Sequence, residues 1–210
     1  ARNVGDQVVE RLFVEVAKSE QLADFPCELS VVAAGSCQEC IERGARLINA
    51  HPDEVTNMYR PAIAANLILY NLMEWTEGDN VVITDLSYPS IPYILSDIGR
   101  RYGVELRVVR NVDGEVPMEK MEEAIDGRTR LVAVDRTAAF SGFTFDMKTL
   151  CRIAHDQGAL VLDDAMQALG AIDIDVADDG VDMLISGSYK WQCGPEGAGL
   201  FYMRRDVMES

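Results

Sequence analysis

Lys190 stands where a lysine could do chemistry. It comes shortly after an apolar run, Asp182–Ser186, and its neighbours are small residues or carry hydroxyl groups. Partial desolvation lowers the pKa of a lysine, and the neutral amine then attacks carbonyl groups. Asp164 ends another apolar run 26 residues earlier. Together these residues indicate a site that combines a nucleophilic amine with a carboxylate.

A tight turn is predicted directly after this lysine. The stretch from Gly194 to Gly199 reads Gly-Pro-Glu-Gly-Ala-Gly, and glycine and proline spaced in this way turn a chain sharply beneath a ligand. By themselves these features indicate a site and do not identify its ligand.

Short strands alternating with helices must position these residues. Near-continuous apolar runs are typical of strands that are covered on both faces. The predicted strands are Val81–Asp85, Glu105–Val109, Arg130–Asp135, Ala159–Asp163, Asp182–Ser186 and Ala198–Met203. The predicted helices cover residues 36–49, 61–75, 89–102, 117–125 and 147–157; a capping box at Ser36 and a first-turn proline at Pro61 mark two of their starts.

This alternation predicts an α/β fold, a three-layer α/β/α sandwich with a mostly parallel sheet. Ligands bind such sheets beyond the carboxyl ends of the strands, which is where Asp164 and Lys190 lie. We predict an N-terminal helical segment over residues 1–35 and a large domain over residues 36–210.

The composition argues against several classes of protein. A net charge of −16 disfavours a nucleic-acid partner, because binding to phosphates needs a surface rich in Lys and Arg. The apolar runs are too short to span a membrane, and the sequence from Ala1 onward lacks the order of a secretory signal. We therefore expect a cytoplasmic protein that binds neither nucleic acid nor membrane.

The cysteines do not predict a disulfide framework or a metal site. The chain has five of them at irregular spacing. Cys37-x-x-Cys40 has no second Cys/His pair to complete a set of metal ligands. We expect packed, reduced thiols and no bound metal, and we expect Cys193 to be buried despite its closeness to Lys190 in the sequence.

The stretch from about Ala33 to Arg205 resembles the large domain of fold-type I pyridoxal-phosphate enzymes, in the group of class V aminotransferases and cysteine desulfurases. The resemblance rests on Asp164-x-x-Gln167, followed after about two dozen residues by Lys190 and then by Gly-Pro-x-Gly-x-Gly. Residues 81–90 and 129–142 match more weakly. The resemblance implies pyridoxal 5'-phosphate as the cofactor and a small-molecule amino acid as the substrate.

The resemblance also implies roles for individual residues. Lys190 would hold the cofactor as a Schiff base and later move the substrate's α-proton. Asp164 would pair with the protonated pyridine nitrogen, which keeps the ring ready to accept electrons. Gln167 would donate a hydrogen bond to the phenolic oxygen. Tyr88 matches the position of an aromatic ring that stacks on the pyridine.

The cofactor phosphate is the least well matched part of the pattern. Tyr189 matches a residue that reaches the phosphate, and Ser186 or Ser188 could assist it. The family's hydroxyl-bearing phosphate loop is replaced here by residues 56–62, which lack the matching hydroxyls. Arg60 and the backbone amides from Ala62 onward are the candidates that remain, because a helix N-terminus attracts anions. Arg60 could equally be an ordinary surface residue.

Other interpretations of these residues stay open at this point. Asp164 could be a helix N-cap, Gln167 a residue on a helix surface and Tyr88 an aromatic in a turn. Asp163 should point to the other face of the sheet and is predicted to be structural. In the loop after Val134 the family's asparagine has become Ala139. The neighbouring Arg136 could bind a substrate carboxylate or be a solvated charge.

Full enzymes of this group continue past the position of Ser210 with a smaller C-terminal domain. The chain is therefore expected to be a large domain without its small domain, completed by a further domain or chain, and the resemblance implies a homodimer. The favoured function is a carbon–sulfur lyase or cysteine desulfurase-like reaction on an amino acid. A class V aminotransferase is the alternative, and a non-catalytic remnant of the same fold is a third.

Overall fold

A seven-stranded sheet forms the middle layer of residues 39–209, which are the residues that the computed structural model describes. Its strands are β1 (Val55–Asn57), β2 (Asn80–Thr84), β3 (Glu105–Val109), β4 (Thr129–Asp135), β5 (Leu160–Asp164), β6 (Met183–Gly187) and β7 (Gly199–Met203). They lie in the order β1-β7-β6-β5-β4-β2-β3. The five strands β6, β5, β4, β2 and β3 run parallel to one another. Strand β7 runs antiparallel to both of its neighbours, β6 and β1.

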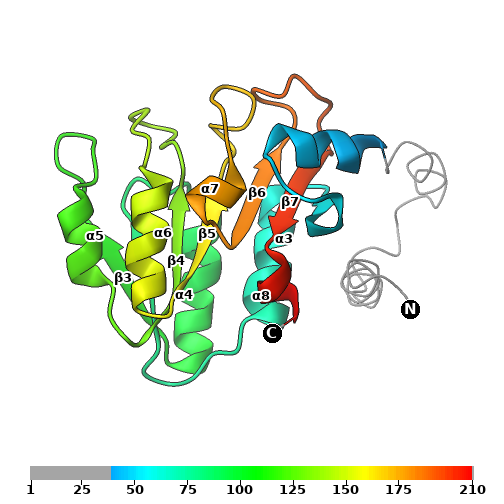
Figure 1. Cartoon of the computed structure of the whole chain (residues 1–210). Coiled ribbons are helices and arrows are strands. Elements are labelled where there is room, and N and C mark those ends of the chain that lie inside the picture. Colours follow the sequence, from blue (N-terminus) through cyan, green and yellow to red (C-terminus); the bar gives the residue numbers. More distant parts are fainter. Residues whose placement is uncertain (1–38, 210) are drawn as a thin grey trace.

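Helices cover both faces of this sheet (Figure 1). They are α3 (Pro61–Leu67), which continues as the π-helix η3 (Ile68–Leu72), α4 (Ser90–Tyr102), α5 (Met118–Ala124), α6 (Met147–Asp156), α7 (Val176–Asp179) and α8 (Arg205–Glu209). The short 3₁₀ helix η2 (Pro52–Glu54) precedes β1. Residues 39–47 are also helical. None of the helices in the described part of the chain is long and apolar enough to cross a membrane.

Two apolar cores fill the space on either side of the sheet. One contains side chains of α5, α6 and α7, and the other contains side chains of α3, η3 and α4. Successive residues of a strand point to opposite faces. Accordingly Val132 and Val134 join the first core, whereas Leu131 and Ala133 join the second. This explains why the strands read as continuous apolar runs, and it confirms the predicted α/β sandwich with a mostly parallel sheet.

All six predicted strands are present, and their ends differ from the predicted ends by at most one residue. Four elements escaped prediction: β1, η2, α7 and α8. The first has only three residues and is defined by its pairing with β7, in which Val55 lies opposite Tyr202. Such a pairing joins residues far apart in the sequence and leaves no local pattern.

The helix predicted over residues 61–75 ends earlier, at Leu72, and its last turn is π-helical. Within it Asn66 and Asn71 each donate a side-chain hydrogen bond to the carbonyl four residues earlier, at 2.8 and 3.1 Å. Such bonds compete with the regular backbone pattern. The predicted N-terminal segment over residues 1–35 and the helix start at Ser36 lie outside the described residues.

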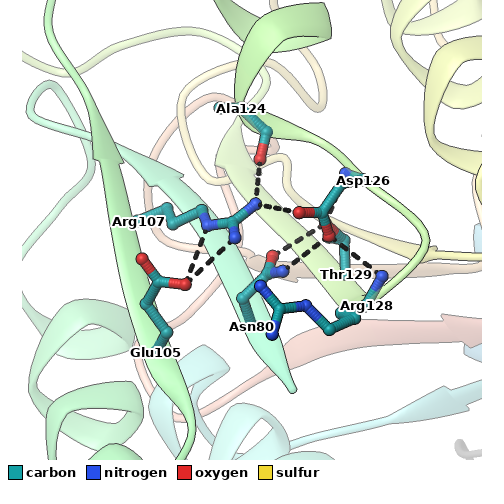
Figure 2. A network of polar contacts seen from close by, with 7 residues as sticks. All are labelled: Asn80, Glu105, Arg107, Ala124, Asp126, Arg128 and Thr129. Carbon is teal, nitrogen blue, oxygen red and sulfur yellow. Dashed lines mark hydrogen bonds and ion pairs between the residues drawn. The ribbon is translucent and has the colours of Figure 1, made fainter. Parts of the chain in front are cut away.

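A network of polar contacts lies at the amino ends of β2 and β4 (Figure 2). The Arg107 guanidinium, from β3, donates to Asp126 at 2.8 Å and to the Ala124 carbonyl at 2.9 Å. Asp126 also accepts hydrogen bonds from Asn80, in β2, and from the Arg128 backbone N–H, both at 2.9 Å. The network joins the turn after α5 to β2 and β3, on the side of the sheet opposite the carboxyl ends of the strands.

Asp126→Asn should lower the resistance of the protein to denaturant. The hydrogen bonds from Arg107, Arg128 and Asn80 hold the pKa of Asp126 well below its ordinary value. A carboxyl with a depressed pKa stabilises the fold above its unfolded pKa, and this stabilisation is lost as the pH falls through the folded pKa. The difference between Asp126→Asn and wild type should therefore be present at pH 7 and shrink in acid.

Urea denaturation of the full-length protein at a series of pH values measures this difference. Asp113→Asn is the matched control, because Asp113 is an exposed aspartate with a positive φ of 52° that asparagine tolerates. Equal midpoints for Asp126→Asn and wild type at pH 7 would contradict a stabilising role for the network.

Candidate functional site

An open cavity of about 190 Å³ lies at the carboxyl ends of β4 and β5, beside the turn that follows β6. Most of the residues singled out from the sequence line it, and they come from four separate parts of the chain. These residues are Arg60, Ala62, Tyr88, Asp164, Gln167, Tyr189 and Lys190. The fold therefore brings together the predicted amine, carboxylate, amide and aromatic groups.

Asp164 is the last residue of β5 and is buried, with 4% of its surface exposed. Its Oδ1 accepts a hydrogen bond from the Met166 backbone N–H at 3.0 Å. Burial raises the pKa of Asp164, and the nearby Asp135 carboxylate raises it further. Residues 165–168 form a turn and no helix begins there, so the alternative interpretation of Asp164 as a helix N-cap is wrong.

Lys190 and Tyr88 approach each other across the cavity. The Lys190 Nζ lies 5.9 Å from the centre of the Tyr88 ring, a distance typical of a weak cation–π contact. The Tyr88 ring is half exposed. Its backbone N–H donates to both carboxylate oxygens of Asp135, at 3.2 and 3.0 Å. The turn in front of α4 is thereby fixed to the end of β4.

Gln167 is held next to the lysine by an indole. The Trp191 Nε1–H donates a hydrogen bond to Gln167 Oε1 at 3.2 Å. Gly170 lets the two turns meet, because a Cβ at this position would lie 2.6 Å from the Trp191 carbonyl oxygen and because its φ of +95° favours glycine. Gln167 lies in a turn, so the alternative of a helix-surface residue is wrong.

Ser188 shapes the loop after β6 and does not line the cavity. Its hydroxyl donates to the Pro195 carbonyl at 2.7 Å, and its backbone N–H donates to the Ala198 carbonyl at 2.9 Å. Gly194 packs against it so closely that a Cβ would lie 2.7 Å from the Ser188 Cβ. The hydroxyl is engaged within its own loop, so Ser188 is not retained among the candidate phosphate ligands.

Arg60 lies at the cavity wall immediately before α3. Its guanidinium is 3.3 Å from a carboxylate oxygen of Glu196, and both side chains are mostly exposed. The guanidinium also lies 5.4 Å from the centre of the Tyr59 ring. Arg60 is the cationic side chain on this side of the cavity, and its present partner is an exposed carboxylate that an anion can displace.

Arg136, a candidate for the substrate carboxylate, lies elsewhere. Its side chain is only 5% exposed and is not part of the cavity lining. It contacts Asp163 at 2.6 Å and Asp179, in α7, at 2.7 Å. Asp163 is completely buried and, as predicted, points to the other face of the sheet. Successive residues along the chain here point to opposite faces of the sheet. Arg136 therefore lies on the face away from the cavity, where it neutralises Asp163, and it does not face a substrate.

Asp135 is a buried acid of the cavity lining that the sequence analysis did not single out. It ends β4 as Asp164 ends β5, and the two residues are partners in the parallel ladder. The sequence could have indicated Asp135, because it is an acid at the end of an apolar run, as Asp164 is. Cys193 differs from the expectation as well, since both it and Cys40 are exposed. Cys151 is buried as expected, whereas Cys27 and Cys37 lie outside the described residues.

A family model described as Aminotransferase class-V matches residues 27–210 of the chain. This chain belongs to that family. Among curated proteins, this class V chain is 35% identical over 178 residues to a probable cysteine desulfurase of Methanothermobacter thermautotrophicus. It is 31% identical over 166 residues to the uncharacterized aminotransferase YcbU of Bacillus subtilis. The matches cover 83% and 79% of this chain and 44% of each relative.

Solved structures show the same fold. The cystine C-S lyase C-DES, in complex with its reaction product cysteine persulfide, matches with a TM-score of 0.79 at 19% identity, over 98% of this chain and 55% of that one. The apo cysteine desulfurase of Thermococcus onnurineus NA1 matches with a TM-score of 0.78 at 24% identity, over 97% of this chain and 53% of that one. This class V chain therefore spans about half the length of the proteins it matches.

The Arg136–Asp163 pair behind the site should be a strong stabilising element of this class V domain. Arg136→Met removes one partner and leaves a buried carboxylate uncompensated, which typically costs about 3–5 kcal/mol. Because Asp163 can escape by taking up a proton, the loss should be larger at pH 8 than at pH 5. Urea denaturation of the full-length protein at both pH values measures it.

Arg152→Met is the matched control, since Arg152 pairs with Asp156 at 3.3 Å on the surface of α6 with both side chains mostly exposed. Exposed pairs of this kind contribute about 0–1 kcal/mol. Similar losses for the two variants would show that the buried pair has no special weight.

Proposed function

We propose that this chain is the cofactor-binding domain of a pyridoxal-phosphate enzyme that acts on an amino acid. The observation that carries the proposal is the meeting of Lys190, Asp164 and Tyr88 in one cavity, although they come from three separate segments of the chain. The family and its desulfurase and aminotransferase relatives support it.

The residues of the cavity fit this cofactor by their chemistry. A primary amine at Lys190 is what a covalent link to an aldehyde requires. A buried acid, Asp164, is a partner for a ring nitrogen, and the amide of Gln167 is a partner for a phenolic oxygen. The Tyr88 ring offers an aromatic face on the side of Lys190. Arg60, Tyr189 and the backbone at Ala62 remain for the phosphate.

Pyridoxal phosphate, when bound, supplies an electron sink for the carbanion formed at the substrate α-carbon. The chain's own residues perform the remaining tasks. Lys190 accepts and returns the α-proton through its Nζ. Asp164 keeps a proton on its partner atom, because a buried carboxylate gains most from an opposite charge within reach. Tyr88 lines the cavity beside Lys190, where its ring can pack against a planar ring.

We propose a cysteine desulfurase-like or carbon–sulfur lyase reaction as the chemistry of the whole protein. The relatives named as cysteine desulfurases support this choice, and so does the fold shared with a cystine C-S lyase. The alternative, a class V aminotransferase, is favoured by the similarity to YcbU. A homodimer is part of the proposal, and the exposed rings of Tyr59, Tyr88, Tyr189 and Trp191 near the cavity support it.

The cofactor is tested by absorbance. Full-length protein mixed with pyridoxal phosphate should show a visible–near-ultraviolet band that borohydride removes, and mass spectrometry should then find the added mass on the Lys190 peptide. Lys190→Ala should lose both signals because no other amine lies at this place in the cavity lining. Lys148→Ala is the control, since Lys148 lies on the surface of α6 and pairs with Asp178.

A wild-type protein without the band would contradict the proposal and favour a non-catalytic domain that keeps the fold.

The reaction is tested by products. The full-length protein should release sulfide or a persulfide from cysteine or cystine, and it should not exchange amino groups between amino acids and keto acids. Amino-group exchange without sulfur release would reject the lyase and support the aminotransferase. Lys190→Ala is the negative control in both assays, because the same Nζ moves the α-proton in each reaction.

A further inference from the structure

The cavity contains a second buried acid besides Asp164. Asp135 is the last residue of β4, and in the parallel ladder it is the partner of Asp164 at the end of β5. Paired strands lie about 4.8 Å apart. Both side chains line the cavity, and the two residues are only 6% and 4% exposed. Two carboxyl groups therefore stand side by side on one wall.

Asp135 is also the anchor of Tyr88. Both of its oxygens accept the Tyr88 backbone N–H, at 3.2 and 3.0 Å. This contact ties the turn before α4 to the end of β4 and holds the Tyr88 ring 5.9 Å from the Lys190 Nζ. Removing the acceptor would leave this N–H unsatisfied and release the turn.

The charges around Asp135 do not balance. Asp164 faces it from β5, Lys190 faces it from the turn after β6, and the Tyr88 backbone N–H faces it from the turn before α4. The Asp163 charge also acts on Asp135, from the opposite face of the sheet. Arg136 already compensates Asp163 on the other face of the sheet. Of the charged residues that line the cavity, Arg60 pairs with Glu196. Two buried acids thus share one amine, Lys190.

Two carboxylates beside each other in a buried site cannot both ionise without a further positive charge. Burial raises the pKa of both acids, and the Asp135 charge raises the pKa of Asp164 further. A ligand that places a protonated, positively charged ring nitrogen at Asp164 supplies the missing charge. With a neutral ring atom at that place, the two carboxylates repel each other or one of them takes up a proton.

We propose that Asp135 is a positioning residue of this site, which fixes Tyr88 beside Lys190 and makes the cavity favour a ring that is positively charged at the atom facing Asp164. The inference rests on the proposed function and extends it, since it gives Asp135 a part in setting the charge of the ring atom that faces Asp164. Asp135 acts through Tyr88 and Asp164 and takes no part in forming or breaking a bond.

Asp135→Asn separates the two effects, because the asparagine oxygen can still accept the Tyr88 N–H while the charge is removed. The probes are pyridoxal 5'-phosphate and its 1-deaza analogue, in which a C–H group replaces the ring nitrogen. The measurement is the ratio of their equilibrium dissociation constants for the full-length protein, followed by absorbance. The covalent link to Lys190 is common to both probes and cancels in the ratio.

Wild type should bind pyridoxal phosphate more tightly than the analogue, and Asp135→Asn should reduce this preference about tenfold, which corresponds to about 1.4 kcal/mol. Asp135→Ala should in addition weaken both probes together, because it also releases Tyr88. If Asp135→Asn does not fold, as judged by thermal unfolding, Asp135→Ser takes its place as a second neutral variant and should show the same reduced preference.

An unchanged ratio in the neutral variants would overturn the proposal. That result is distinct from failure of the proposed function, in which wild type would show no band that depends on Lys190 with either probe. A ratio lost equally in Asp135→Asn and in the surface control Asp113→Asn would also overturn it, since the effect would then be one of overall charge.

Discussion

The parallel pairing of β4 with β5 is the constraint on which the rest of the site depends. Because the two strands run in the same direction and in register, Asp135 meets Asp164 and Val134 meets Asp163. The alternation of side chains along a strand then sends the first pair into the cavity and turns Asp163 to the opposite face. One ladder therefore separates the acids that face a ligand from the acid that Arg136 neutralises behind them.

The lysine depends on a second device, the turn between β6 and β7. These strands pair antiparallel, with Gly187 opposite Gly199, so that the chain must leave the sheet and return within a short distance. Ser188 closes this loop through its bond to the Pro195 carbonyl. Gly170 packs directly against it from the turn after β5. The loop that carries Lys190 is thus held by a hydrogen bond within it and by packing against the turn after β5, as a preorganised site requires.

The two acids of the cavity make the folded state less stable than apolar residues at the same positions would. Burying two acids side by side disfavours the ionised form of both, whereas apolar residues there would pack without such a conflict. The same chain neutralises Asp163 with a buried arginine and satisfies the Asp126 carboxylate with three polar partners. Asp163 and Asp126 are thus compensated by the protein, whereas Asp135 and Asp164 lie where a ligand can provide the opposite charge.

The sequence alone determined six of the seven strands, because apolar runs of five or six residues and their spacing follow from burial on two faces. It also identified Lys190, Asp164 and Gln167, whose types and spacing are local. Only the tertiary structure decided what Arg136 and Asp135 do. Asp135 ends β4 and Arg136 follows it. Their opposite facing depends on contacts between distant segments, since Arg136 pairs with Asp179 of α7 and Asp135 accepts the Tyr88 N–H. The sequence indicated Asp164 and Lys190 through their types and spacing. Strand register, which a local pattern does not show, placed the second acid, Asp135, beside Asp164.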